Sequence, residues 1–208
     1  MKLTRKQYIL GGVVAVAVAA SGAFILFRQS AKPTKAVVIT QSTDKPSEEK
    51  PGKDYKWSGG PEDPKKIIIS KVGVDSYVQQ VGVDQNNQVA VPNNLFMVGW
   101  FVKTVQPGKP GLSVIDGHVT NRKNLGVFND LNKLVKGDRY TVLQGSGKKL
   151  TYEVIDMQTL PADKSVAVIF SQDPSVKSQL NLVTCAGIFN EQTRQYPDRL
   201  VVAAKLVD

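Results

Sequence analysis

The sequence has very little cysteine and histidine. Its 208 residues include one cysteine, Cys185, and one histidine, His118. A single cysteine excludes a disulfide framework, and one cysteine with one histidine excludes a Cys/His zinc cluster. The chain is too apolar to be disordered, because 41% of its residues are hydrophobic and only 22% are charged. We therefore expect one ordinary folded domain whose covalent chemistry depends on very few side chains.

Acidic residues are also scarce, 18 against 27 basic ones, which gives a formal net charge of +9. The excess is uneven, because residues 1–61 alone hold ten basic and four acidic residues. Most of it therefore lies before the part of the chain that has a globular composition. A protein that binds nucleic acid usually concentrates its positive charge on the folded face. The distribution argues against nucleic acid as a partner.

One stretch lacks charge altogether. Residues 8–27 are twenty uncharged residues, long enough at about 1.5 Å per residue to cross a hydrocarbon core of about 30 Å. They predict a single transmembrane anchor after a cytoplasmic tail, residues 1–7. A cleaved signal peptide is the alternative, because basic residues precede the run and small residues lie near its end. We expect the anchor to be retained, with the long C-terminal part outside the cell membrane.

Residues 28–64 are polar and rich in proline. Such a composition buries too little apolar surface to offset the loss of chain entropy on folding. The segment therefore predicts a flexible polar linker between the anchor and a folded domain at residues 65–208.

Short runs rich in Val, Ile, Leu and Thr fill residues 65–208, and turn residues separate them. Eight such runs predict a mostly β fold, a closed or nearly closed eight-stranded barrel with one or two short helices. A two-sheet sandwich is the alternative. The expected helix covers residues 124–134, where apolar residues recur every three positions. The expected strands are 66–74, 79–84, 88–92, 112–119, 139–145, 150–160, 179–185 and 199–207.

Cys185 ends an apolar run and precedes Ala186 and Gly187, so we expect it at a strand end that faces a turn of small residues. A thiol in that position is held rigid and stays accessible to a substrate. The alternative is a buried free cysteine that behaves as a small hydrophobic residue. The local sequence leaves both interpretations open.

His118 also follows an apolar run, in the sequence DGHVT. Its side chain is the only one whose ordinary pKa, about 6.5, suits proton exchange with Cys185 near neutral pH. A structural histidine with satisfied hydrogen bonds is the alternative. Asp116 shares the strand face of His118 if the strand stays regular, which makes it an orienting group. The alternative is a turn-forming aspartate before Gly117.

Two arginines are candidates for binding negative charge near Cys185. Arg199 opens the last strand, and antiparallel pairing of that strand with the Cys185 strand would bring its guanidinium near the thiol. A guanidinium stays charged and can donate to a developing oxyanion. Arg194, in the intervening loop, is able to do the same. The alternative for either one is a solvated surface charge.

Several short motifs resemble those of the sortase family, and in particular its class F-like group. NLVTC at 181–185 is similar to the family's Thr-Leu-x-Thr-Cys motif, and GHV at 117–119 is similar to its histidine motif. VGWF at 98–101 and KGDRY at 136–140 are similar to flanking segments of the family. The resemblance covers about residues 65–208.

The sequence departs from the family pattern in two ways. Asn181 stands where the motif usually has its first threonine, which we expect to change the packing of the strand and to leave the nucleophile intact. The loop before the last strand offers two arginines instead of one obvious candidate. The family's arginine typically precedes the final strand directly, which favours Arg199 over Arg194.

The resemblance implies a membrane-anchored cysteine transpeptidase. Cys185 would attack the threonine carbonyl of a Leu-Pro-x-Thr-Gly-like sorting signal and form a thioacyl enzyme, while His118 transfers protons and Arg199 stabilises the oxyanion. The implied partners are surface proteins with such a signal, an amine acceptor such as a cell-wall precursor or a pilin lysine, and the membrane. No cofactor is required, and no metal ligands are identified. The alternatives are a cysteine hydrolase of the same motif and a non-catalytic, membrane-tethered barrel that binds the cell wall.

Overall fold

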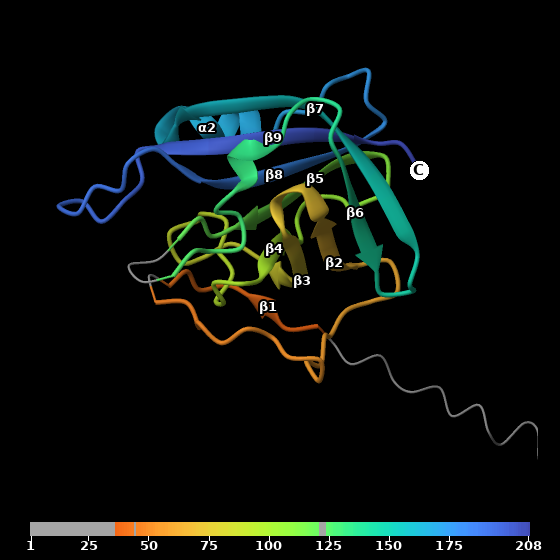
Figure 1. Ribbon diagram of the computed structural model, residues 1–208, viewed down its shortest axis with the longest axis horizontal. Coiled ribbons are helices and arrows are strands. Elements are labelled where there is room, and N and C mark those ends of the chain that lie inside the picture. The colour runs from red at the N-terminus through yellow and green to blue at the C-terminus, as the bar shows by residue number, and fades with distance from the viewer. Residues whose placement is uncertain (1–35, 44, 121–123) are drawn as a thin grey trace, which may run out of the picture. The chain divides into compact units, whose positions relative to one another are not determined.

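The computed structural model describes residues 36–43, 45–120 and 124–208, which fold as one β-barrel with a short helix on its outside (Figure 1). The strands are β1 (Val38–Ile39), β2 (Pro64–Ile69), β3 (Val74–Val81), β4 (Val98–Phe101), β5 (Gly111–Gly117), β6 (Arg139–Gln144), β7 (Lys149–Pro161), β8 (Ser178–Ala186) and β9 (Asp198–Leu206). The helices are α2 (Ala162–Ile169) and two 3₁₀ turns, η1 (Ser70–Val72) and η2 (Leu131–Lys133).

The eight longer strands close on themselves. Their order is β3-β2-β6-β7-β9-β8-β5-β4, and β3 also pairs with β4, which joins the two ends of the sheet. The expected closed, mostly β barrel is thereby confirmed. The two-residue strand β1 adds in parallel to the end of β3. A closed barrel of this kind leaves few unpaired strand edges.

Apolar side chains fill the inside of the barrel, and a second cluster covers part of its outside. Leu200, Val202 and Ala204 alternate along β9 and point into the interior cluster. In β8, seven consecutive residues are buried, because the outer face of the strand is covered too. Val183 belongs to a second apolar cluster there, and Gln179 and Asn181 hydrogen-bond Ser171 O and Ile169 O. That outer cluster consists of Val81, Ala90, Phe101, Val114 and Val183.

The prediction of a helix at residues 124–134 is wrong. The segment forms turns followed by the 3₁₀ turn η2. Its apolar residues recur every three positions, which matches a 3₁₀ helix at three residues per turn better than an α-helix at 3.6. Phe128, Leu131 and Leu134 are buried, whereas Leu125 is exposed. The three-residue spacing therefore predicts which side chains are buried, Phe128, Leu131 and Leu134, but it does not indicate an α-helix.

Helix α2 was not expected from the sequence. It begins directly after Pro161, and none of the side chains that the structure describes caps its N-terminus. It packs on β7 and β9 (Figure 1). Since its eight residues include the β-branched Val166, Val168 and Ile169, its composition does not separate it from a strand.

Two strand predictions also need correction. The run 66–74 is interrupted at η1, where Gly73 adopts a left-handed φ of 68°, and β3 begins after it. Residues 88–92 form no strand and contribute one isolated bridge between Val83 and Val89. The missing barrel strand is instead β4, at residues 98–101.

The described part of segment 28–64 lies along the barrel. The backbone N–H of Ser47 donates to Asn93 O at 2.8 Å, and its C=O accepts from Leu95 N at 2.9 Å. The indole Nε1 of Trp57 donates to Val78 O in β3 at 3.0 Å. The domain boundaries given above stay a prediction. Residues 36–43 and 45–63, which we call the strap, are hydrogen-bonded to the barrel.

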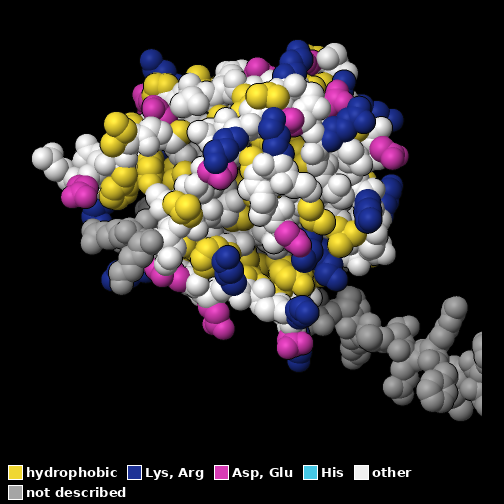
Figure 2. All heavy atoms as spheres, viewed as in Figure 1, with side chains coloured by type: hydrophobic (Ala, Val, Ile, Leu, Met, Phe, Trp, Pro, Cys, Tyr) yellow, Lys and Arg dark blue, Asp and Glu magenta, His cyan; other side chains and the backbone are white. Residues whose placement is uncertain are grey.

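Within the described ranges no helix is long and apolar enough to cross a membrane. The expected anchor at residues 8–27 lies outside those ranges. On the face shown in Figure 2, basic side chains are interspersed with acidic and hydrophobic ones.

Candidate active site

Strand register places three of the expected residues level with one another. In the antiparallel pair β8–β9, Cys185 pairs with Arg199. In the parallel pair β5–β8, Asp116 pairs with Val183, so a further step of two residues brings His118 level with Cys185. The expected antiparallel pairing of the last two strands is therefore confirmed. It places Arg199 opposite Cys185, and His118 follows directly after the end of the neighbouring strand β5.

Cys185 and His118 open into the same pocket, which has a volume of about 720 Å³. The strap contributes Thr43, Lys45 and Pro46 to one side of it. The loop between β8 and β9 supplies another side, where the rings of Phe189 and Tyr196 lie 5.1 Å apart. A peptide that enters this pocket meets the thiol and the imidazole together.

Cys185 is half-buried at the end of β8. Burial raises the pKa of its thiol above the ordinary value, the positive charge of Arg199 lowers it, and Asp116 raises it. The net direction is upward, so the group is a neutral thiol at neutral pH.

His118 lies just beyond the end of β5, and its Nε2 is 2.7 Å from the backbone oxygen of Pro92. Burial lowers the pKa of the imidazole, and the hydrogen bond to Pro92 opposes this by a smaller amount. The ring is therefore neutral at neutral pH. The thiol and the imidazole form an uncharged pair in this structure.

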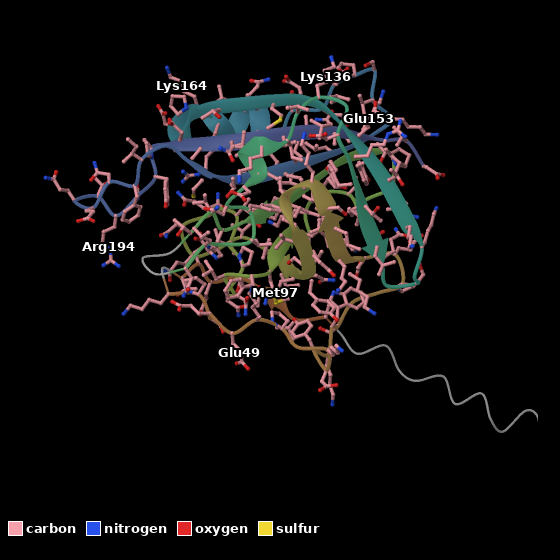
Figure 3. The ribbon with its side chains drawn as sticks, in the orientation of Figure 1. Glu49, Met97, Lys136, Glu153, Lys164 and Arg194 are labelled. Carbon is pink, nitrogen blue, oxygen red and sulfur yellow. The ribbon has the colours of Figure 1, made fainter. Side chains whose placement is uncertain are left out.

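The two arginines occupy different positions. Arg199 is half-buried, and its Nη1 donates to the backbone oxygens of Tyr196 at 3.1 Å and Asp198 at 2.8 Å. Arg194 is exposed on the projecting β8–β9 loop (Figure 3), and it is one of the residues that line the pocket. Both lie near the thiol side of the barrel, and Arg199 is the one whose charge acts on the pKa of Cys185.

Asp116 belongs to β5 and is not a turn residue. Its Oδ1 is buried and has no hydrogen-bond partner among the described residues. Burial raises the pKa of this carboxyl well above its ordinary value. The oxygen packs over Gly99, where an added Cβ would come within 2.6 Å of it. The side chain thus belongs to the packing between β4 and β5, and the hydrogen bond described for His118 goes to Pro92.

Sequence reasoning missed the loop groups around the pocket. Pro92 is 26 residues from His118 in the chain, and its contribution is a backbone oxygen that no side-chain pattern reveals. Thr184 lies within the recognised motif, and its Oγ1 donates to Gly117 O at 2.7 Å, which joins the ends of β8 and β5. Among residues 36–43, 45–120 and 124–208 no group of three or more His, Cys, Asp or Glu side chains is placed to hold a metal ion.

Comparison with known proteins identifies one family. A family model described as "Sortase domain" matches residues 67–207. A search of the curated proteins found no match.

Solved structures with the same fold include several sortases. The chain is 22% identical to a lid mutant of sortase A from Corynebacterium diphtheriae, with a TM-score of 0.54 over 69% of each chain. It is 26% identical to sortase C-1 from Actinomyces oris, with a TM-score of 0.52 over 70% of this chain and 75% of the other. It is also 26% identical to a sortase D5 transpeptidase from Clostridium perfringens, with a TM-score of 0.51 over 70% and 79% of the two chains.

Proposed function

Because the chain belongs to the sortase family of cysteine transpeptidases, we propose that Cys185 is its nucleophile, His118 its proton-transfer group and Arg199 its oxyanion donor. The observation that supports this assignment is the strand register. It aligns Cys185 with Arg199, while Cys185 and His118 line one pocket. These three side chains supply the nucleophile, the base and the positive charge that acyl transfer requires.

The neutral resting pair defines the first step. As the Sγ of Cys185 attacks the scissile carbonyl, His118 takes the thiol proton, so no free thiolate has to exist beforehand. The carbonyl oxygen becomes negatively charged in the tetrahedral intermediate, and the guanidinium of Arg199 stabilises that charge.

Collapse of the intermediate breaks the C–N bond. The imidazolium of His118 gives its proton to the departing amine, and a thioester remains on Cys185. An acceptor amine then attacks the thioester, His118 removes its proton, and the thiolate leaves and is reprotonated. A new amide bond forms, and the enzyme returns to its initial state.

The proposal extends to the substrate and the location. The peptide is a Leu-Pro-x-Thr-Gly-like sorting signal at the C-terminus of a surface protein, and the acceptor is an amine such as a cell-wall precursor or a pilin lysine. The chain is a class F-like member held by a single N-terminal membrane span, with its barrel outside the cell. Support for the location comes from the uncharged run at residues 8–27.

The test of the nucleophile uses peptides with this signal and an added amine, with products identified by mass spectrometry. Wild type should yield the amide product and a thioester on Cys185, whereas Cys185→Ala should yield neither. Transpeptidation that survives in Cys185→Ala would reject this nucleophile. Release of the acid alone, even at high amine concentration, would instead identify a hydrolase.

Two matched variants, Arg199→Ala and Arg194→Ala, test which arginine is the oxyanion donor. Because Arg199 lowers the pKa of the Cys185 thiol, its loss should move the pH profile of thiol alkylation to higher pH and lower kcat. Loss of Arg194 should leave that profile in place. The reverse pattern would assign the role to Arg194.

A further inference from the structure

One hydrogen bond determines which nitrogen of His118 is available for proton transfer. Nε2 lies 2.7 Å from the backbone oxygen of Pro92, and a carbonyl oxygen only accepts hydrogen bonds. Nε2 therefore carries the hydrogen. A neutral imidazole has one N–H and one basic nitrogen, so the lone pair lies on Nδ1.

The peptide plane that provides this carbonyl is held from its other end. The C=O of Pro92 and the N–H of Asn93 belong to the same planar peptide unit and point in opposite directions. The Oε1 of Gln79 accepts from Asn93 N at 3.1 Å. Gln79 and His118 therefore hold opposite ends of one rigid group.

Further bonds fix the same peptide to the barrel. The Nε2 of Gln79 donates to Asn93 Oδ1 at 2.7 Å, so the two side chains form a reciprocal pair. Gln79 lies in β3, a strand of the barrel wall, whereas Pro92 lies in a loop between strands. The strap also holds this loop, because Ser47 N donates to Asn93 O at 2.8 Å. Gln79 thus fixes the loop carbonyl of Pro92 relative to strand β3.

We propose that Gln79 is a positioning residue that acts through the Pro92–Asn93 peptide to hold His118 as the Nε2–H tautomer, leaving Nδ1 to exchange protons with Cys185. The exchange with Cys185 rests on the proposed function. The tautomer and the role of Gln79 in fixing it do not, since they concern hydrogen bonds of the resting protein.

The measurement exploits the presence of a single histidine. The full chain, without a histidine tag and kept in detergent, is labelled with ring-¹⁵N histidine and examined by NMR at pH 8. Wild type should show a protonated, pyrrole-type nitrogen at Nε2 and an unprotonated, pyridine-type nitrogen at Nδ1. A protonated Nδ1 in wild type overturns the proposal without the need for any variant.

Variants then test Gln79. Gln79→Met keeps the length of the side chain and removes its hydrogen bonds, so both tautomers should appear. If the chain is active, kcat should fall by about ten- to a hundredfold with little change in KM, because the ring is misplaced. Gln79→Glu keeps an acceptor for Asn93 N–H and should restore the single tautomer.

The matched control is Gln80→Met. Gln80 is the next residue of β3, is also half-buried, and donates from Nε2 to Asp63 Oδ2 at 2.9 Å, away from the Pro92 loop. It should leave the tautomer and kcat unchanged. An unaltered tautomer in folded Gln79→Met refutes the role of Gln79. A wild-type Nε2–H tautomer in a chain that processes no peptide supports the positioning and rejects the proposed function.

Discussion

A buried amide pair on β8 gives Asn181 a structural role and makes a quantitative prediction. Asn181 is 1% exposed. Its Nδ2 donates to Ile169 O at the end of α2 at 2.9 Å, and its Oδ1 accepts from Gln179 Nε2 at 2.8 Å. The side chain therefore attaches the C-terminus of the helix to the strand that carries Cys185.

Removing this amide leaves one buried group and one partly buried group without their partner. In Asn181→Ala the carbonyl of Ile169 and one N–H of Gln179 lose their hydrogen bonds, and each unsatisfied group costs about 1–3 kcal/mol. We expect the free energy of unfolding to fall by about 3 kcal/mol. For a domain of this size, about 2–4 °C of Tm is lost per kcal/mol, which gives a decrease of about 6–12 °C.

Thermal and denaturant unfolding of the purified chain measure this loss. Asn181→Thr should fall between wild type and Asn181→Ala, because a hydroxyl replaces part of the hydrogen bonding. Asn132→Ala, the same change at an exposed position, is the control and should stay within about 0.5 kcal/mol of wild type. If Asn181→Ala costs no more than Asn132→Ala, the attachment of α2 through this amide is refuted.

Two further predictions concern the strands that flank the pocket. Because the pKa of Asp116 is raised on folding, the stability it contributes is present at low pH and is lost as pH rises from about 3.9 through the folded pKa. Asp116→Asn should therefore gain Tm over wild type, by an amount that grows from pH 4.5 to pH 8, and a constant difference would contradict the buried carboxyl. Thr184→Val should lower the free energy of unfolding by about 1–2 kcal/mol, because it leaves Gly117 O without this donor. Thr184→Ser should retain most of that stability in the same unfolding experiment, and equal losses in the two variants would count against the bond.

The barrel was predictable because its strands are short, apolar and separated by turn residues. The errors arose where local pattern and tertiary packing disagree. Residues 88–92 alternate like a strand, yet they cover the outer face of the barrel as a loop. Strand β4 has only four residues, all buried, and so carries no alternating pattern to detect. Helix α2 is rich in β-branched residues, and its position depends on partners such as Asn181 far along the chain.

The candidate site was predictable to the extent that it lies on strands. A thiol that ends one strand and an arginine that opens the next come close together when the two strands pair in antiparallel fashion, and Cys185 does pair with Arg199. The surroundings of His118 were not predictable, because its hydrogen-bond partner is a backbone carbonyl of a distant loop. Likewise, no pattern indicated that Asp116 would be enclosed over Gly99, since glycine is commonest in turns and here allows close packing of two strands.

Burial also determines the charge states of the Cys185 thiol and the His118 imidazole. Taking Cys185 and His118 partly out of water raises the pKa of the first and lowers that of the second, so each loses its tendency to ionise alone. In the proposed mechanism the thiol becomes nucleophilic only as its proton moves to the imidazole, which requires both groups to be held in place. Arg199 is the charged group that favours the thiolate, and it is fixed opposite Cys185 by strand pairing. In that mechanism, strand register, burial and the hydrogen bond to Pro92 therefore act on one step, the transfer of the thiol proton during attack.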